Sequence, residues 1–203
     1  RGHSATDVVN ASNLIKKYNI SLGLQMMIGL YGSTPEKDTE TAEKLISLSP
    51  DTVRIYPTIT MKDTFLEKYY NDKKYVPYSE ETTINTCAKI LKMFYDKEIN
   101  VIRVGLHYSD ELVNTSVAGF YHPAFRELCE SKMFLDMLIN EIKKYPQGEF
   151  SVIVGNKFIS KAIGQKKANI KVLKELGYIV TFKQSNNLKD FQFIIKERGD
   201  LCY

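Results

Sequence analysis

Helical and strand patterns alternate through the first part of this chain, and this alternation constrains its fold more than any other feature. Apolar residues recur with helical spacing in three segments, residues 4–18, 34–48 and 79–95. Each is followed by a predicted strand, at residues 20–28, 52–59 and 100–107. The first strand is apolar on both faces, as buried parallel strands are. The repeated order predicts an α/β fold, in which crossover helices connect the strands of a parallel sheet.

The predicted helices begin at residues that cap helix N-termini. Ser4 and Ser79 offer side-chain oxygens to the first free backbone N–H groups of their helices. Thr34 does the same and precedes Pro35, whose fixed backbone suits the first helical position. Between these elements we predict only connections: a polar, Tyr-rich stretch before Ser79, and a loop from His107 to Tyr121.

A smaller module is predicted at the end of the chain. A long helix should run from Pro123 to about Tyr145, before the clearest boundary, Pro146-Gln147-Gly148. Beyond it we predict a small α+β module with a strand, a short helix, a loop, a second helix and two strands, at residues 150–154, 157–163, 164–167, 168–176, 178–183 and 191–196. We divide the chain accordingly, with boundaries at 1–121, 122–148 for the connecting helix, and 149–203.

Composition limits the environment and the partners. Cys87, Cys129 and Cys202 are far apart, which favours a reducing, cytoplasmic location over a disulfide framework, and they are not grouped as iron–sulfur ligands are. No apolar run reaches 18 residues, so we expect no membrane helix. From Glu149 onward there are ten Lys and Arg against five Asp and Glu, whereas the first 148 residues hold 18 against 19. The basic tail indicates either an anionic partner or a solvated Lys-rich face.

Three short motifs occur in order on the first part of the chain. The run from Gln25 to Gly32, QMMIGLYG, ends a strand in glycines; Tyr56-Pro57 ends the next strand; Arg1-Gly2-His3 precedes both. By themselves they also fit an ordinary strand with a Gly turn, a core Tyr and a solvated terminal Arg. Together they resemble the second half of a radical S-adenosylmethionine (SAM) enzyme barrel, most closely in the radical subunit of Elongator and its bacterial relatives, then in oxygen-independent coproporphyrinogen oxidases.

The resemblance implies a cofactor site in which each motif has a role. Arg1 would lie near the methionyl carboxylate of SAM, and Gln25 stands where coproporphyrinogen oxidases have an Asp that contacts the cofactor. Gly29 would let the backbone approach the adenosine, and Tyr56 and Pro57 would flank the adenine. It also implies a [4Fe–4S] cluster bound by CxxxCxxC, which this sequence lacks.

We therefore expect the chain to be the C-terminal half of an incomplete, partial TIM-like barrel whose N-terminal half carries the cluster. The chain alone should be inactive and hold no metal, and we assign it no catalytic residue. Arg103 and His107, at a strand end, either bind an anionic substrate or form internal salt bridges.

The tail carries a separate resemblance. Gly164-Gln165-Lys166-Lys167, between two predicted helices and followed by Lys171, resembles the Gly-x-x-Gly loop of KH domains, which lies against a nucleic-acid backbone. Lys167 replaces the second glycine, so the module serves either RNA binding or docking. The combined expectation is a fragment of a radical SAM enzyme that acts on tRNA. The alternatives are a radical SAM enzyme for a small molecule or tetrapyrrole, and a non-catalytic RNA-binding module.

Overall fold

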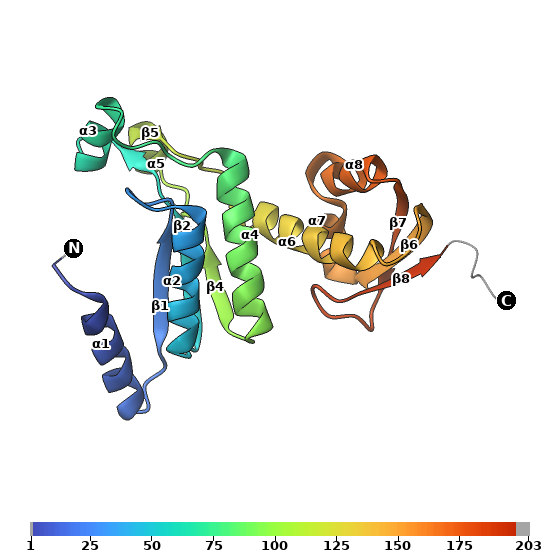
Figure 1. The fold of residues 1–203 in the computed structure, drawn as a ribbon, viewed down its shortest axis with the longest axis horizontal. Coiled ribbons are helices and arrows are strands. Elements are labelled where there is room, and N and C mark those ends of the chain that lie inside the picture. The colour runs from blue at the N-terminus through green and yellow to red at the C-terminus, as the bar shows by residue number, and fades with distance from the viewer. Residues whose placement is uncertain (1, 198–203) are drawn as a thin grey trace. The chain divides into compact units, whose positions relative to one another are not determined.

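The computed structural model describes residues 2–197 (Figure 1). The chain forms two compact units, which divide between Arg126 and Glu127. Each unit has its own sheet and its own buried core, and each is considered by itself. None of the helices within the described residues is long and apolar enough to cross a membrane.

The first unit is built on a parallel sheet of three strands. These are β1 (Gly23–Ile28), β2 (Thr52–Pro57) and β4 (Asn100–Val104), in the order β1-β2-β4. The helices α1 (Ala5–Lys17), α2 (Pro35–Ser47) and α4 (Glu80–Asp96) precede them in turn. Figure 1 shows α2 and α4 on the same face of this sheet. The predicted α/β order and parallel sheet are confirmed.

Alternation along the strands separates a core face from an open face. Met26, Ile55 and Val104 are buried with the apolar residues of α2 and α4, whereas their neighbours point the other way. The predicted N-caps are also present. The Oγ of Ser4 accepts a hydrogen bond from the Asp7 amide at 3.2 Å, and Thr34 and Ser79 cap α2 and α4 in the same way.

The two stretches predicted to be loops contain regular structure, so the prediction was wrong there. They contain two helices and an antiparallel pair of short strands, namely β3 (Thr60–Met61), α3 (Phe65–Asn71), α5 (Asp110–Thr115) and β5 (Ser116–Ala118). These elements are too short to show a periodic pattern, and α3 buries none of its residues, which removes the amphipathic signal. Only the caps Thr64 and Ser109 mark the two helices in the sequence.

The second unit combines three helices with a three-stranded sheet. Its helices are α6 (Phe125–Ile142), α7 (Ile159–Ile163) and α8 (Ala168–Glu175), with short 3₁₀ turns at Asn156–Phe158 and Gln165–Lys167. The strands are β6 (Gly148–Gly155), β7 (Tyr178–Ser185) and β8 (Phe193–Glu197), in the order β7-β6-β8. Strand β6 pairs with β7 in parallel and with β8 antiparallel.

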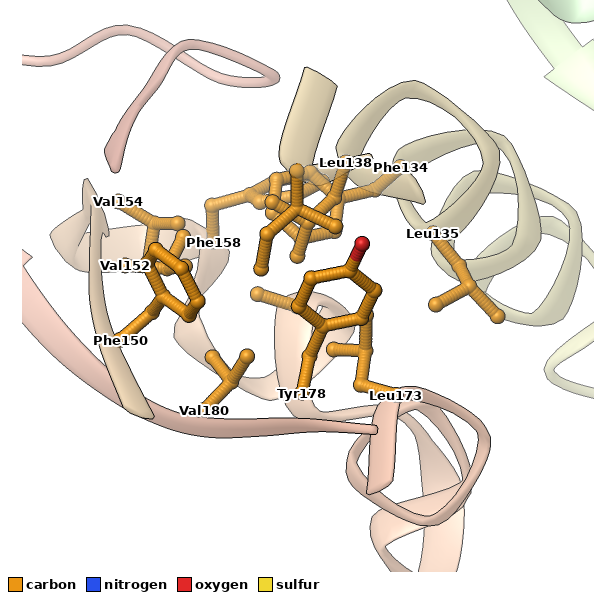
Figure 2. Packing of buried hydrophobic residues seen from close by; sticks show 12 residues of the cluster. Phe134, Leu135, Leu138, Phe150, Val152, Val154, Phe158, Leu173, Tyr178 and Val180 are labelled. Carbon is orange, nitrogen blue, oxygen red and sulfur yellow. The ribbon is translucent and has the colours of Figure 1, made fainter. Parts of the chain in front are cut away.

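Aromatic packing holds α6 on this sheet (Figure 2). The Phe134 ring of α6 lies 5.1 Å from that of Phe158 and 5.5 Å from that of Phe193, measured between centroids. Leu138, from the next turn of α6, is fully buried in the same cluster. Such ring pairs add to the stabilisation from burial alone, so the last turns of α6 are part of the core of the second unit.

The turn between α7 and α8 has an unusual backbone. Gly164, Lys166 and Lys167 all have positive φ angles, of 77°, 50° and 62°. The buried amide of Asn169 holds this turn, because its Nδ2 donates to the carbonyl of Ala162 at 3.0 Å and to the Oγ of Ser131 at 3.0 Å. The fold therefore imposes a left-handed conformation on two lysines, which disfavour it.

We expect Lys167→Gly to stabilise the chain by about 0.5–1 kcal/mol, since glycine avoids the left-handed strain and loses only part of that gain as chain entropy. Urea denaturation measures the effect. Lys171→Gly, at an exposed position inside α8, is the matched control and should destabilise by about 0.7 kcal/mol. Equal destabilisation by both variants would contradict the prediction.

Candidate functional site

The open face of the first sheet carries the residues predicted to bind cofactor and substrate. Gln25 of β1 lies opposite Arg54 of β2, and Arg54 lies opposite Arg103 of β4. One step further along the strands, Met27 lies opposite Tyr56. Residues paired in this way across parallel strands point to the same face. Two rows of side chains therefore lead toward the carboxyl end of the sheet.

A cavity of about 620 Å³ opens where these strands end. It is lined by residues of β1, β2 and β3 and by the segment after β4, namely Gln25, Met27, Tyr56, Met61, Leu106, His107, Ser109, Glu111 and Leu112. The carboxyl edge of a parallel sheet is where α/β proteins bind their ligands. The structure thus brings together three residues that the sequence predicted to be in the site: Gln25, Tyr56 and His107.

A buried carboxylate shapes the turn at the end of β1. Asp38 of α2 is 3% exposed and accepts hydrogen bonds from the Gly29 amide at 2.9 Å, the Ser33 hydroxyl at 2.5 Å and the Tyr78 hydroxyl at 3.0 Å. The Tyr75 hydroxyl donates to the Gly29 carbonyl at 2.7 Å. Both backbone polar groups of Gly29 are therefore held by side chains from other elements, and the direction in which the chain leaves β1 is fixed.

Gly29 cannot be replaced easily in this arrangement. Its φ is 74°, and a Cβ at this position would lie 3.2 Å from the Tyr78 ring. Burial, and then the bond to Asp38, raise the pKa of Tyr78 well above its usual value, and burial likewise raises the pKa of Tyr75. Both phenols therefore remain hydrogen-bond donors at physiological pH.

Sequence reasoning missed Asp38, Tyr75 and Tyr78. One signal could have revealed Asp38: it lies four and seven residues before Ala42 and Leu45, on the buried face of α2. An acidic residue at such a position needs hydrogen-bond donors. The tyrosines gave no comparable signal, because the stretch before α4 has several tyrosines and no periodicity.

The other predicted residues lie at identifiable places. Pro57 is buried at the end of β2, where the Thr58 hydroxyl donates to the Ile28 carbonyl at 2.7 Å and joins the two strand ends. The Nε of half-buried Arg103 donates to the Gly105 carbonyl at 3.1 Å, and His107 is exposed at the cavity. Arg1 lies outside the described residues.

The predicted nucleic-acid residues lie in the second unit. Gly164, Gln165, Lys166 and Lys167 form the turn before α8, and Lys171 follows one helical turn later. All except Gly164 are exposed. Within residues 2–197, no three His, Cys, Asp or Glu side chains come together as a metal site. Cys87 and Cys129 are buried, and Cys202 lies outside the described residues.

Comparison with known proteins bears on the resemblance seen in the sequence. Residues 50–134 match the Radical_SAM C-terminal domain family. A tRNA uridine(34) acetyltransferase of Dehalococcoides mccartyi is 27% identical over 135 residues, which cover 65% of this chain and 29% of the relative. Elongator complex protein 3 of Bos taurus is 27% identical over 136 residues, 66% of this chain and 24% of its own length. This chain resembles the Elongator-type radical SAM proteins.

A solved structure extends the likeness to the fold. The archaeal Elp3 of Methanocaldococcus infernus, with an N-terminal deletion, superposes with a TM-score of 0.57 at 22% identity. The match covers 78% of this chain and 35% of that one. The chain therefore spans less than a third of the length of the two curated relatives described. The fold that it shares with the archaeal Elp3 extends beyond the segment that the family model matches.

Asp38→Asn should destabilise the chain by about 2–3 kcal/mol, because the amide turns one acceptor into a donor facing other donors in a buried site. Urea denaturation measures the loss. Glu40→Gln, on the exposed face of the same helix, is the matched control and should change stability little. If the two variants were equally stable, the Asp38 bonds would not be what holds the β1 turn.

Proposed function

We propose that this chain forms the C-terminal part of the barrel of a radical SAM enzyme and that this enzyme modifies tRNA. The observation that carries the proposal is the cavity at the carboxyl edge of the sheet, lined by Gln25, Tyr56 and His107. The match of residues 50–134 to the radical SAM family and the tRNA-modifying relative support it. The parallel β1-β2-β4 sheet with its crossover helices supports a partial TIM-like barrel.

SAM fits the residues that line this cavity. A volume of about 620 Å³ lies within the usual range for small-molecule sites. The Gln25 carbonyl can accept hydrogen bonds from ribose hydroxyls, and Tyr56 can flank the adenine. Gly29 and Pro57 are buried at the ends of the same strands, so they would shape the edge of the cavity rather than line it. Arg1 completes the proposed contacts through the methionyl carboxylate. Held by these residues, SAM would supply, together with a [4Fe–4S] cluster, the hydrogen-abstracting chemistry of a radical SAM enzyme.

The chain itself positions the reactants and supplies none of the redox chemistry. The described residues offer no cluster ligands, so we assign the cluster to the other half of the barrel and expect this chain alone to be inactive. Met27, Leu106 and Leu112 contribute apolar side chains to the lining of the cavity. Arg103 and His107 are the proposed substrate contacts. The buried, widely separated Cys87 and Cys129 suit a reducing cytoplasm.

The second unit is proposed to bind RNA as a KH-like module. Strand β6, helices α7 and α8 and strand β7 follow one another as strand–helix–helix–strand, with the Gly164–Lys167 turn between the helices. Lys167 and Lys171 lie one helical turn apart at the start of α8, where the helix dipole also favours phosphate. The excess of basic residues after Glu149 supports an anionic partner.

In the longer protein that carries the cluster, Gln25→Ala should weaken SAM binding by about 1–2 kcal/mol, the value of one or two polar contacts. Equilibrium dialysis with labelled SAM measures this. Gln184→Ala, at an exposed position on β7, is the matched control and should bind normally. If SAM affinity stayed unchanged in a folded Gln25 variant, the cofactor site would lie elsewhere.

Changing Lys166, Lys167 and Lys171 to Ala should lower tRNA affinity and reduce the slope of log affinity against log salt by about 2, at roughly 0.7 per phosphate contact. Gel-shift titrations at several salt concentrations measure it. Three exposed lysines of the first unit, Lys17, Lys89 and Lys97, form the control triple and should have little effect. If the triple variant of the turn binds tRNA like the parent, or if neither protein binds tRNA, the KH-like module is a structural appendage and a small-molecule substrate becomes the better proposal.

A further inference from the structure

We propose that Arg54 and Arg103 form a phosphate-binding site on the open face of the β1-β2-β4 sheet. The site would hold the phosphate of a substrate nucleotide one row before Met27 and Tyr56 along the strands, next to Gln25, the proposed ribose contact. This inference rests on the proposed function, and it names the chemical class of the substrate: a nucleotide, whether free or within an RNA strand.

The register of the sheet places the two arginines next to each other on adjacent strands. Arg54 and Arg103 are direct partners on adjacent parallel strands, whose axes lie about 4.8 Å apart. Both are on the face opposite the buried Ile55 and Val104. Arginine is charged at any physiological pH, and like charges directly opposite each other destabilise a sheet. The strands therefore maintain a repulsion that a bound anion would remove.

Nothing in the described chain neutralises this pair. Within residues 2–197, neither arginine forms an ion pair, and Arg103 makes only its 3.1 Å bond to the Gly105 carbonyl. The same-face positions around them hold no carboxylate: Gly23, Met27, Thr52, Tyr56 and Asn100. Glu111 lines the cavity above them but pairs with neither arginine.

The pair does not belong to a generally basic surface either. Residues 1–126 contain 15 Lys and Arg and 15 Asp and Glu, so the first unit is neutral overall. Its basic and acidic groups are equal in number, yet two of its four arginines are direct neighbours on adjacent strands. Such local concentration of charge in a neutral unit favours a specific anion over diffuse attraction.

The donor set fits phosphate better than carboxylate. One guanidinium fork satisfies both oxygens of a carboxylate, whereas two forks need the additional oxygens and charge of a phosphate group. The Gln25 amide completes the row with a further donor. Gln25 also lines the cavity, so it connects the arginine row to the cavity at the carboxyl end of the sheet.

The spacing of the rows gives the substrate an orientation. The row of Met27 and Tyr56 lies two residues beyond the arginine row, about 6.6 Å along the strands. A sugar attached to the bound phosphate would therefore lie level with Met27 and Tyr56, beside the proposed cofactor. Radical transfer requires such close placement of the two reactants.

Thermal unfolding of the 203-residue chain in inorganic phosphate tests the site at constant ionic strength. Phosphate at about ten times its Kd should raise Tm by about 3–6 °C, and acetate should raise it less. Arg54→Gln and Arg103→Gln should each abolish the phosphate-dependent rise. Without phosphate, Arg54→Gln should be at least as stable as the parent, because the repulsion is gone. Lys143→Gln, at an exposed position after α6, should respond to phosphate like the parent.

Equal effects of phosphate and acetate, or a parent-like response of Arg54→Gln, would overturn the phosphate site. Uridine 5′-monophosphate should raise Tm more than phosphate at the same concentration, and uridine should have little effect; no gain over phosphate would overturn the nucleotide assignment. If a short oligouridylate raises Tm in the parent but not in Arg54→Gln, the bound phosphate belongs to RNA. If only uridine 5′-monophosphate raises Tm, the phosphate belongs to a free nucleotide. These measurements need neither SAM nor tRNA, so their failure is distinguishable from failure of the proposed function.

Discussion

The carboxylate of Asp38 is the constraint on which the proposed site depends. It lies in α2, which packs on the sheet, and it holds the Gly29 amide at the point where β1 ends. Because Tyr75 binds the carbonyl of the same glycine, the exit of β1 is fixed from both sides. A backbone turn held in this way is preorganised, and a ligand bound there has no loop to order. The same buried side chain, Asp38, therefore lies in the packed face of α2 and fixes the backbone at the edge of the cavity.

Helix–strand order and helix starts could be predicted because their causes are local. A Ser or Thr cap acts on an amide three residues away, and an apolar periodicity needs only its own segment. Helix α3 could not be predicted in this way, since it has only about two turns and none of its residues is buried. The β3–β5 pair depends on partners more than fifty residues apart, and Lys62 joins the two segments by donating its amide to the Thr115 carbonyl at 2.8 Å. Contacts of that separation have no local signature.

The residues in and beside the cavity also divide into those that the sequence could indicate and those that it could not. Gln25 and Tyr56 were predicted from the resemblance to radical SAM proteins and His107 from its place at a strand end, and the structure brings them together because strand ends of a parallel sheet converge. That Arg54 lies opposite Arg103 could not be foreseen, because the register shifts between Val53 and Arg54. Without that irregularity Arg54 would lie opposite Ile102, and Arg103 would be carried to the other face. One extra residue in β4 thus decides whether the two charges meet.

Charge and backbone strain point to different roles for the two units. In the first unit the opposing charges balance in number, and Arg54 and Arg103 lie next to each other in the row of Gln25, which lines the cavity. In the second unit, lysines are exposed on a turn whose backbone the buried Asn169 holds in a left-handed form. Two guanidinium forks on adjacent strands select an anion by shape, whereas exposed lysines on a rigid turn attract a long polyanion with little selection. Each unit, considered by itself, thus has a charge arrangement that suits the RNA-modifying role proposed above.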